Sequence, residues 1–68
     1  MNEQVIQIAK RIKELREVLE MSLEDVSMQL GVCIEDYRRY EEGKDDIPIG
    51  VLYGAAALFQ VDPTLLLT

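Results

Sequence analysis

The chain has 68 residues, of which 49% are hydrophobic and 29% are charged, and its formal net charge is −6. This length suits one small domain, and the composition is that of a globular chain rather than a disordered one. A domain of about 60 residues buries only about 60% of its unfolded surface, which leaves little room for an enclosed substrate pocket. We therefore expect a single domain over residues 1–68 that is not an enzyme.

The residue types that the chain lacks argue against catalytic and metal-binding functions. It has no His, the commonest general base and metal ligand, and a single Cys, Cys33, which cannot form an internal disulfide or a four-ligand zinc site. Neighbouring acidic residues such as Glu24 and Asp25 diverge by about 100° on a helix and do not converge on one ion. We expect no catalytic residue, no metal site and no cofactor.

The sequence also indicates where the protein works. No apolar run approaches the about 20 residues that span a bilayer, and the first residues lack the basic region of a signal peptide. The absence of a disulfide framework suits a reducing compartment. We expect a cytoplasmic protein without a membrane partner.

Apolar periodicity predicts a first helix from about residue 5. Apolar residues recur at steps of three and four, which places them on one helical stripe while most charged residues lie off it. The members of this stripe are Val5, Ile8, Ile12, Leu15 and Leu19. The stripe predicts an amphipathic helix packed on a core.

Capping residues predict the second helix. Ser22 is a favourable N-cap, and Asp25, three residues later, forms a capping box with it. Val26 and Leu30 would point inward, and Gly31 would take the left-handed conformation that ends many helices.

A third helix follows after a very short connection. Cys33 stands at its N-cap as a small apolar substitute for Ser or Thr, and Asp36 in the first turn favours the helix dipole. Tyr37 and Tyr40 share one face, which we predict to point into the core. We expect this helix to end at Gly43.

Two further helices complete the chain. After a polar loop over residues 44–46, Pro48 would occupy the first turn of a fourth helix that runs to about Phe59. Asp62 and Pro63 then form an N-cap and first-turn pair that opens a short last turn through Leu67. Five helices without a strand signal predict an all-α fold.

A strip of small residues on the predicted fourth helix has two interpretations. Gly50, Gly54 and Ala57 lie four and three residues apart and give one smooth face. Such a face permits close approach of another helix. The partner is either another molecule or domain, or a helix of the same chain.

The segment from Ser22 to Gly43 carries the functional signal. Two short helices meet at Gly31 with almost no linker, and the small Ser27 lets them pack closely, which is the helix-turn-helix arrangement. The whole chain resembles the Cro/repressor-type, XRE-like helix-turn-helix family. The residues that carry the resemblance are Ile12, Leu15, Arg16, Ser22, Val26, Leu30, Gly31, Val32, Tyr37, Tyr40, Glu41, Gly43, Lys44, Leu58 and Val61. It implies a compact five-helix, lambda-repressor-like DNA-binding domain with a central helix-turn-helix.

Within that family the chain is most similar to regulators that carry a cupin barrel after the helical domain. This similarity rests on Asp36-Tyr37, Tyr40-Glu41, Asp46-Ile47-Pro48, Leu52-Tyr53 and the segment from Asp62 to Leu66. It implies the N-terminal part of a longer regulator, with a linker beginning near Thr68 and a C-terminal cupin-like effector domain.

The resemblance also implies the DNA-binding residues of a bacterial-type transcriptional regulator that binds double-stranded operator DNA as a homodimer. The residues that would face the bases from the third helix are Ile34, Glu35, Arg38 and Arg39, and those that would face phosphates are Ser22, Leu23, Glu42 and Lys44. The chain has Leu23 where the family often has Gln, and Ile34, Glu35 and Asp36 where it often has Arg, Ser or Thr. These departures predict weak DNA affinity.

Charge leaves a second interpretation open. Residues 22–43 carry two bases against six acids. Arg38 and Arg39 could pair with Glu35, Glu41 or Glu42 on their own helix, and Glu35 could be a solvent-facing or capping acid, because a carboxylate near phosphates costs Coulomb energy. The alternative function is a helix-turn-helix scaffold retained for protein–protein contact. The two differ in whether one surface collects Lys10, Arg11, Lys13, Arg38, Arg39 and Lys44.

Overall fold

The computed structural model describes residues 3–67, and Thr68, where we expected a linker to begin, lies outside them. The helices are α1 (Glu3–Val18), α2 (Leu23–Leu30), α3 (Ile34–Glu41), α4 (Ile49–Phe59) and α5 (Pro63–Leu67). No strand occurs between residues 3 and 67. The predicted all-α fold with five helices is confirmed.

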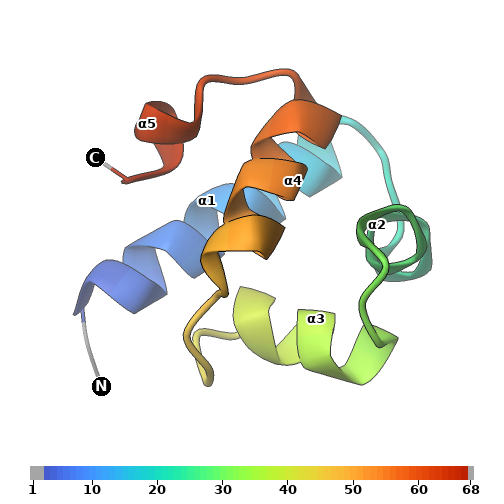
Figure 1. Cartoon of the computed structure of the whole chain (residues 1–68), viewed down its shortest axis with the longest axis horizontal. Helices are drawn as coiled ribbons and strands as arrows, with labels where there is room; N and C mark the ends of the chain where they lie inside the picture. Colours follow the sequence, from blue (N-terminus) through green and yellow to red (C-terminus); the bar gives the residue numbers. More distant parts are fainter. Residues whose placement is uncertain (1–2, 68) are drawn as a thin grey trace.

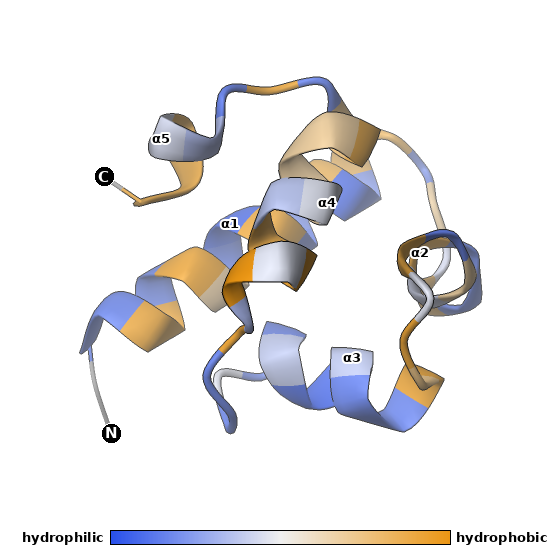
Figure 2. Ribbon diagram, viewed as in Figure 1, coloured by the Kyte–Doolittle hydropathy of each residue, from blue (hydrophilic) through white to orange (hydrophobic). Residues whose placement is uncertain are grey.

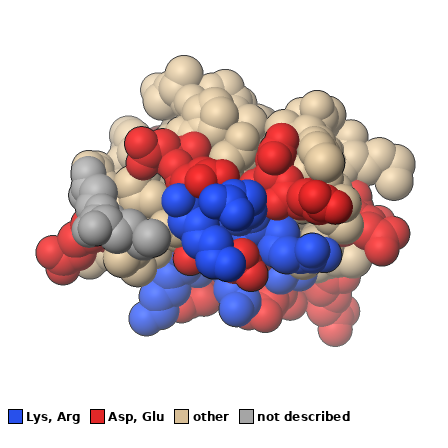
Figure 3. Space-filling view, turned by 90° about the horizontal axis from the view of Figure 1, so that it is seen from below, with Lys and Arg blue, Asp and Glu red and all other residues tan. Residues whose placement is uncertain are grey.

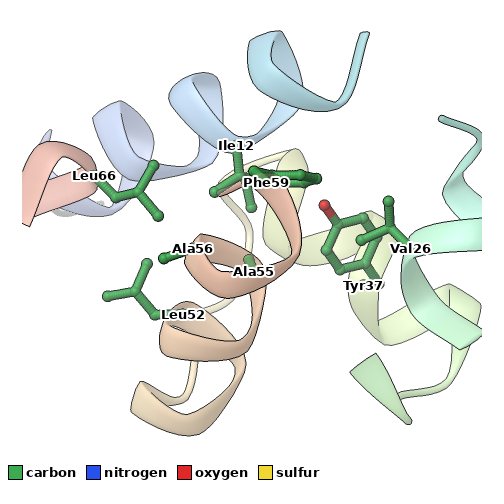
Figure 4. Close-up of a cluster of buried hydrophobic side chains, with 8 residues drawn as sticks. All are labelled: Ile12, Val26, Tyr37, Leu52, Ala55, Ala56, Phe59 and Leu66. Carbon is green, nitrogen blue, oxygen red and sulfur yellow. The ribbon is translucent and has the colours of Figure 1, made fainter. Parts of the chain in front are cut away.

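The helices enclose one core within an envelope of 27 × 24 × 20 Å. Helix α4 crosses α1 in the middle of the molecule, α2 and α3 lie on one side, and α5 packs against α1 and α4 (Figure 1). Side chains from all five helices meet in the core (Figure 4), namely Ile12, Val26, Tyr37, Leu52, Ala55, Ala56, Phe59 and Leu66. No helix within the described residues has the length and apolar character of a membrane span.

Helix α1 follows its predicted stripe except at one end. Ile12 is fully buried, and Ile8 and Leu15 pack against the core. Leu19 was placed wrongly on the inward stripe, because the helix ends at Val18 and Leu19 is 46% exposed. The chain then turns through Glu20, whose φ of 57° is left-handed.

The predicted caps of α2 are confirmed. The Ser22 hydroxyl accepts a hydrogen bond from the Asp25 backbone N–H at 3.0 Å, and the Asp25 carboxylate accepts one from the Ser22 N–H at 3.3 Å. Gly31 ends the helix with φ 70°.

The predicted cap of α5 is confirmed as well. The Asp62 carboxylate accepts hydrogen bonds from the Thr64 backbone N–H at 2.9 Å and the Thr64 hydroxyl at 2.8 Å. These bonds satisfy one of the free donors at the start of the helix and lower the pKa of Asp62.

Two predicted helix boundaries are wrong by one or two residues. Helix α3 ends at Glu41 and not at Gly43, which instead adopts φ 73° in the following turn and faces Ile6 and Ala9. Pro48 caps α4 from outside and the helix begins at Ile49, because Pro48 has an extended ψ of 144°.

The small-residue strip of α4 divides between two environments. A Cβ atom added to Gly54 would lie 3.1 Å from the Leu30 side chain, so this glycine serves the crossing of α4 with α2. A Cβ on Gly50 would meet nothing within 4 Å, and Ala57 is exposed. The intramolecular interpretation therefore holds at Gly54, while Gly50 and Ala57 remain on the surface.

Candidate nucleic-acid interface

Helices α2 and α3 form a tight pair that presents the outer face of α3. The connection is only residues 31–33, and the Val32 N–H donates to the Ser27 carbonyl at 3.0 Å. Cys33 is the N-cap of α3, as predicted, and its side chain makes no capping hydrogen bond. Because α3 lies at the edge of the molecule, its outer side is open to a partner (Figure 1).

The inner side of α3 is held by Tyr37 and Tyr40. The Tyr37 side chain is 0% exposed and lies beside Val26 of α2, as predicted (Figure 4). Tyr40 is half-buried and packs against the core, which also agrees with the prediction. Burial, and after it the neighbouring Glu41 carboxylate, raise the pKa of the Tyr37 phenol.

A buried ion pair between Arg16 and Glu41 ties α3 to α1. The Arg16 Nε donates to Glu41 Oε2 at 2.8 Å, and Nη2 donates to Oε1 at 3.1 Å. The third guanidinium nitrogen, Nη1, donates to the Met21 carbonyl at 2.8 Å, which fixes the turn after α1. The hydrogen bond to Glu41 raises the pKa of Arg16. This pair sets where α3 sits relative to the rest of the domain.

The residues expected to face phosphates from α2 differ in exposure. Ser22 is exposed, and its hydroxyl already accepts the capping bond from Asp25. Leu23 is half-buried and packs against the core. Its side chain therefore contributes to packing and offers no hydrogen bond to a phosphate.

Ion pairs occupy two of the expected basic contacts. Arg39 makes a bidentate pair with Asp45, with Nε–Oδ2 at 2.7 Å and Nη2–Oδ1 at 3.2 Å, and not with an acid of its own helix. The Lys44 Nζ lies 3.2 Å from Glu42 Oε1 and forms an ion pair with it. Arg38 is exposed and forms no ion pair with any residue from 3 to 67. Of Arg38, Arg39 and Lys44, only Arg38 has no acidic partner among the described residues.

The Arg39–Asp45 pair has a defined pH dependence. The hydrogen-bonded Arg39 guanidinium lowers the pKa of Asp45 below the ordinary value of an aspartate side chain. A lowered pKa in the folded state means that the pair contributes to stability above that value, and the contribution is lost as pH falls through the lowered pKa. Because both side chains are exposed, the contribution is small.

The outer face of α3 is mixed in charge. Ile34 is half-buried, and Glu35 and Asp36 are exposed beside Arg38 and Arg39. Viewed from below, Lys and Arg side chains gather in the centre of one face, with Asp and Glu side chains around them (Figure 3). Lys10 and Arg11 line a depression on α1 together with Gln7 and Glu14.

The comparisons with known proteins agree with this architecture. A family described as a helix-turn-helix domain matches residues 9–68. The crystal structure of a restriction-modification controller protein from Aeromonas hydrophila superposes with a TM-score of 0.87 over 96% of this chain and 98% of that chain, at 18% identity. No curated protein sequence matches the chain. The match over residues 9–68 covers most of the sequence, and the chain belongs to the helix-turn-helix domain family.

Proposed function

We propose that the chain is the DNA-binding domain of a cytoplasmic, bacterial-type transcriptional regulator that inserts α3 into the major groove. The observation that carries the proposal is the exposed outer face of α3, where Arg38 forms no ion pair with another described residue. Lys and Arg side chains also gather in the centre of one face of the molecule (Figure 3). In this proposal the residues that face base edges are Ile34, Glu35, Arg38 and Arg39, and those near the phosphates are Ser22, Leu23 and Lys44. No enzymatic activity is part of it.

A variant of Glu35 tests which face meets DNA. Glu35→Gln removes an exposed carboxylate from the face that would approach the phosphates, so the affinity for random-sequence duplex should rise several-fold at low salt. Glu14→Gln changes the net charge equally on α1, where Glu14 lines a groove with Val18 and Leu65. Fluorescence anisotropy titrations of both variants beside wild type provide the measurement. An equal effect of the two variants would show that only net charge matters.

The scaffold function is favoured by a different observation. Glu35 and Asp36 are exposed on α3, while Arg39 and Lys44 are paired with acids. If DNA affinity has been lost, the protein will not bind the promoter region of its own gene at any salt concentration. Binding to that region in preference to a random duplex rejects the scaffold.

The proposal includes a homodimer that associates through the exposed face of α4. Helix α4 contains no charged residue and shows none of the deep blue of α3 (Figure 2). Its exposed side presents Ile49, 61% exposed, and Tyr53, 51% exposed, next to Gly50 and Ala57. A chain of net charge −6 repels its own copy, so an uncharged face favours a symmetric contact in which each residue meets the same patch on the partner.

Placing a charge on this face should abolish the dimer. Tyr53→Glu brings two carboxylates into one symmetric interface, so we expect a monomer in sedimentation equilibrium under conditions in which wild type is dimeric. Met28→Glu is the matched control, because Met28 is 75% exposed on α2. A dimer that survives Tyr53→Glu but not Met28→Glu would place the interface on α2.

A C-terminal cupin-like effector domain in the full-length protein completes the proposal. Its support is the resemblance of the segments around Tyr40, Tyr53 and Asp62 described above. The shared fold covers 98% of the Aeromonas controller protein, so the likeness to that protein offers no support for a C-terminal domain. Sequencing the gene beyond the codon for Thr68 tests this part of the proposal directly.

A further inference from the structure

A hollow between α1, α2 and α3 lies beside the outer face of α3. Its volume is about 340 Å³, and its lining residues are Lys13, Arg16, Leu23, Arg38, Glu41 and Glu42. Lys13, on α1, was expected from the sequence only as one of six bases of a possible basic surface, and not as a residue that faces bases or phosphates. The hollow therefore extends the candidate interface onto a helix outside the helix-turn-helix.

The pairing of its charges leaves the hollow positive. Arg16 is neutralised by Glu41, and its three guanidinium nitrogens all donate hydrogen bonds within the domain. Glu42 lies 3.2 Å from Lys44. Lys13 and Arg38 are both exposed, and neither forms an ion pair with another of the described residues. Two cations without counter-charges thus share one hollow on a protein of net charge −6.

The wall of the hollow is held in place by contacts within the domain, which favours binding of an anion at one position. The hydrogen-bonded Arg16–Glu41 pair, with side chains 12% and 4% exposed, holds one part of its wall in place. Leu23 packs on the core and forms an apolar part of the wall. The two free cations come from different helices, α1 and α3, which the ion pair holds together. An arginine fork and a lysine ammonium are the side chains that proteins use to bind phosphate oxygens.

The geometry points to this hollow as the binding site for one phosphodiester of the DNA backbone, held jointly by Lys13 and Arg38. The inference rests on the proposed function and refines it, since it assigns Arg38 to the backbone rather than to a base edge. Lys13 then supplies the polar contact that Leu23, at the start of α2, cannot make. Because a phosphate contact carries no sequence information, it would position α3 without selecting bases.

The salt dependence of binding to random-sequence duplex tests the inference. Each neutralised phosphate contributes about −0.9 to the slope of log affinity against log salt concentration. Lys13→Ala should therefore weaken binding and reduce the slope by at most about 0.9, because Arg38 still faces the same phosphodiester. Lys10→Ala is the matched control, because Lys10 is an exposed lysine one turn earlier on α1 that lines a different depression. It changes the net charge equally and should leave the slope unchanged.

A double variant distinguishes one shared phosphate from two. If Lys13 and Arg38 hold the same phosphodiester, Lys13→Ala/Arg38→Ala removes one neutralised phosphate and should reduce the slope by about 0.9 in total. A reduction of about twice that amount would mean two separate contacts and would overturn the shared site. Far-UV circular dichroism checks that the variants, all of exposed residues, keep the fold.

The remaining outcomes separate this site from the proposed function. If wild type binds duplex DNA but the Lys13 and Lys10 variants behave alike, the site is wrong and the proposed function stands. If wild type does not bind duplex DNA, both fail. Inorganic phosphate, followed by amide chemical shifts, tests the other source of the same chemistry. A Lys13-dependent response to phosphate without an effect on duplex affinity would assign the hollow to a free anion and overturn the DNA contact.

Discussion

Tyr37→Ala is expected to remove a large part of the stability of the folded protein. The side chain is 0% exposed and is among the largest fully buried side chains in the described part of the molecule. Truncation of a buried large aromatic residue costs about 3–5 kcal/mol. A domain of this size has a total stability of only about 3–10 kcal/mol, on the usual scale per residue. Urea denaturation followed by far-UV circular dichroism measures the loss.

Tyr37→Phe is the control for this prediction. It keeps the ring in the core and removes a buried hydroxyl. This hydroxyl makes no hydrogen bond to any residue from 3 to 67, although the Glu41 carboxylate lies nearby. A buried donor without a partner costs free energy, so the Phe variant should be as stable as wild type or more stable. A loss in Tyr37→Phe as large as in Tyr37→Ala would contradict the account, since it would assign the stabilisation to the hydroxyl and not to the packing of the ring.

Glu41→Gln should be the next most damaging of the single changes considered. It leaves the Arg16 guanidinium, whose side chain is only 12% exposed, without its counter-charge. Removal of one partner of a fully buried ion pair costs about 3–5 kcal/mol, and the loss here should be smaller because part of the Arg16 side chain remains in contact with solvent. The midpoint of urea denaturation should fall accordingly. Since the pair fixes α3 against α1, amide exchange on α3 should also become faster.

An exposed ion pair provides the comparison for Glu41→Gln. Asp45→Asn removes the same charge from the pair with Arg39. In this pair the Arg39 side chain is 51% exposed and the Asp45 side chain is 42% exposed. Solvent screens such a pair, so its denaturation midpoint should stay close to that of wild type. Equal midpoints for Asp45→Asn and Glu41→Gln would show that burial does not strengthen the Arg16–Glu41 pair.

The parts of the fold that sequence predicted well depend on neighbouring residues. Each of these parts has a residue-type signature. The side-chain caps join residues two or three positions apart, as in Ser22 with Asp25 and Asp62 with Thr64, and the left-handed turn is signalled by Gly31 itself. The stripe of α1 was extended too far, to Leu19, because apolar spacing alone does not show where a helix ends. Glu20 ends this helical region in a left-handed conformation without the glycine that would have signalled it.

The charges of the candidate site were harder to predict because their partners are distant or lie outside helices. Arg16 and Glu41 are 25 residues apart, and no spacing rule pairs them. Arg39 was considered only with acids on its own helix, whereas its partner Asp45 lies in the following loop. The hollow that holds Lys13 and Arg38 exists only after α1 and α3 have packed together. Which arginine remains available for a ligand therefore follows from tertiary structure.

The ion pair between Arg16 and Glu41 also makes the helix-turn-helix pair depend on the first helix. It closes a loop of 25 residues that contains the whole of α2, and closing such a loop costs chain entropy before the contact is gained. On the ribosome α1 is synthesised first, so Arg16 is already present when Glu41 emerges. An excised segment of residues 22–43 would lack this anchor and the apolar surface of α1. The helix-turn-helix pair is thus a dependent part of a larger folding unit that begins with the first helix.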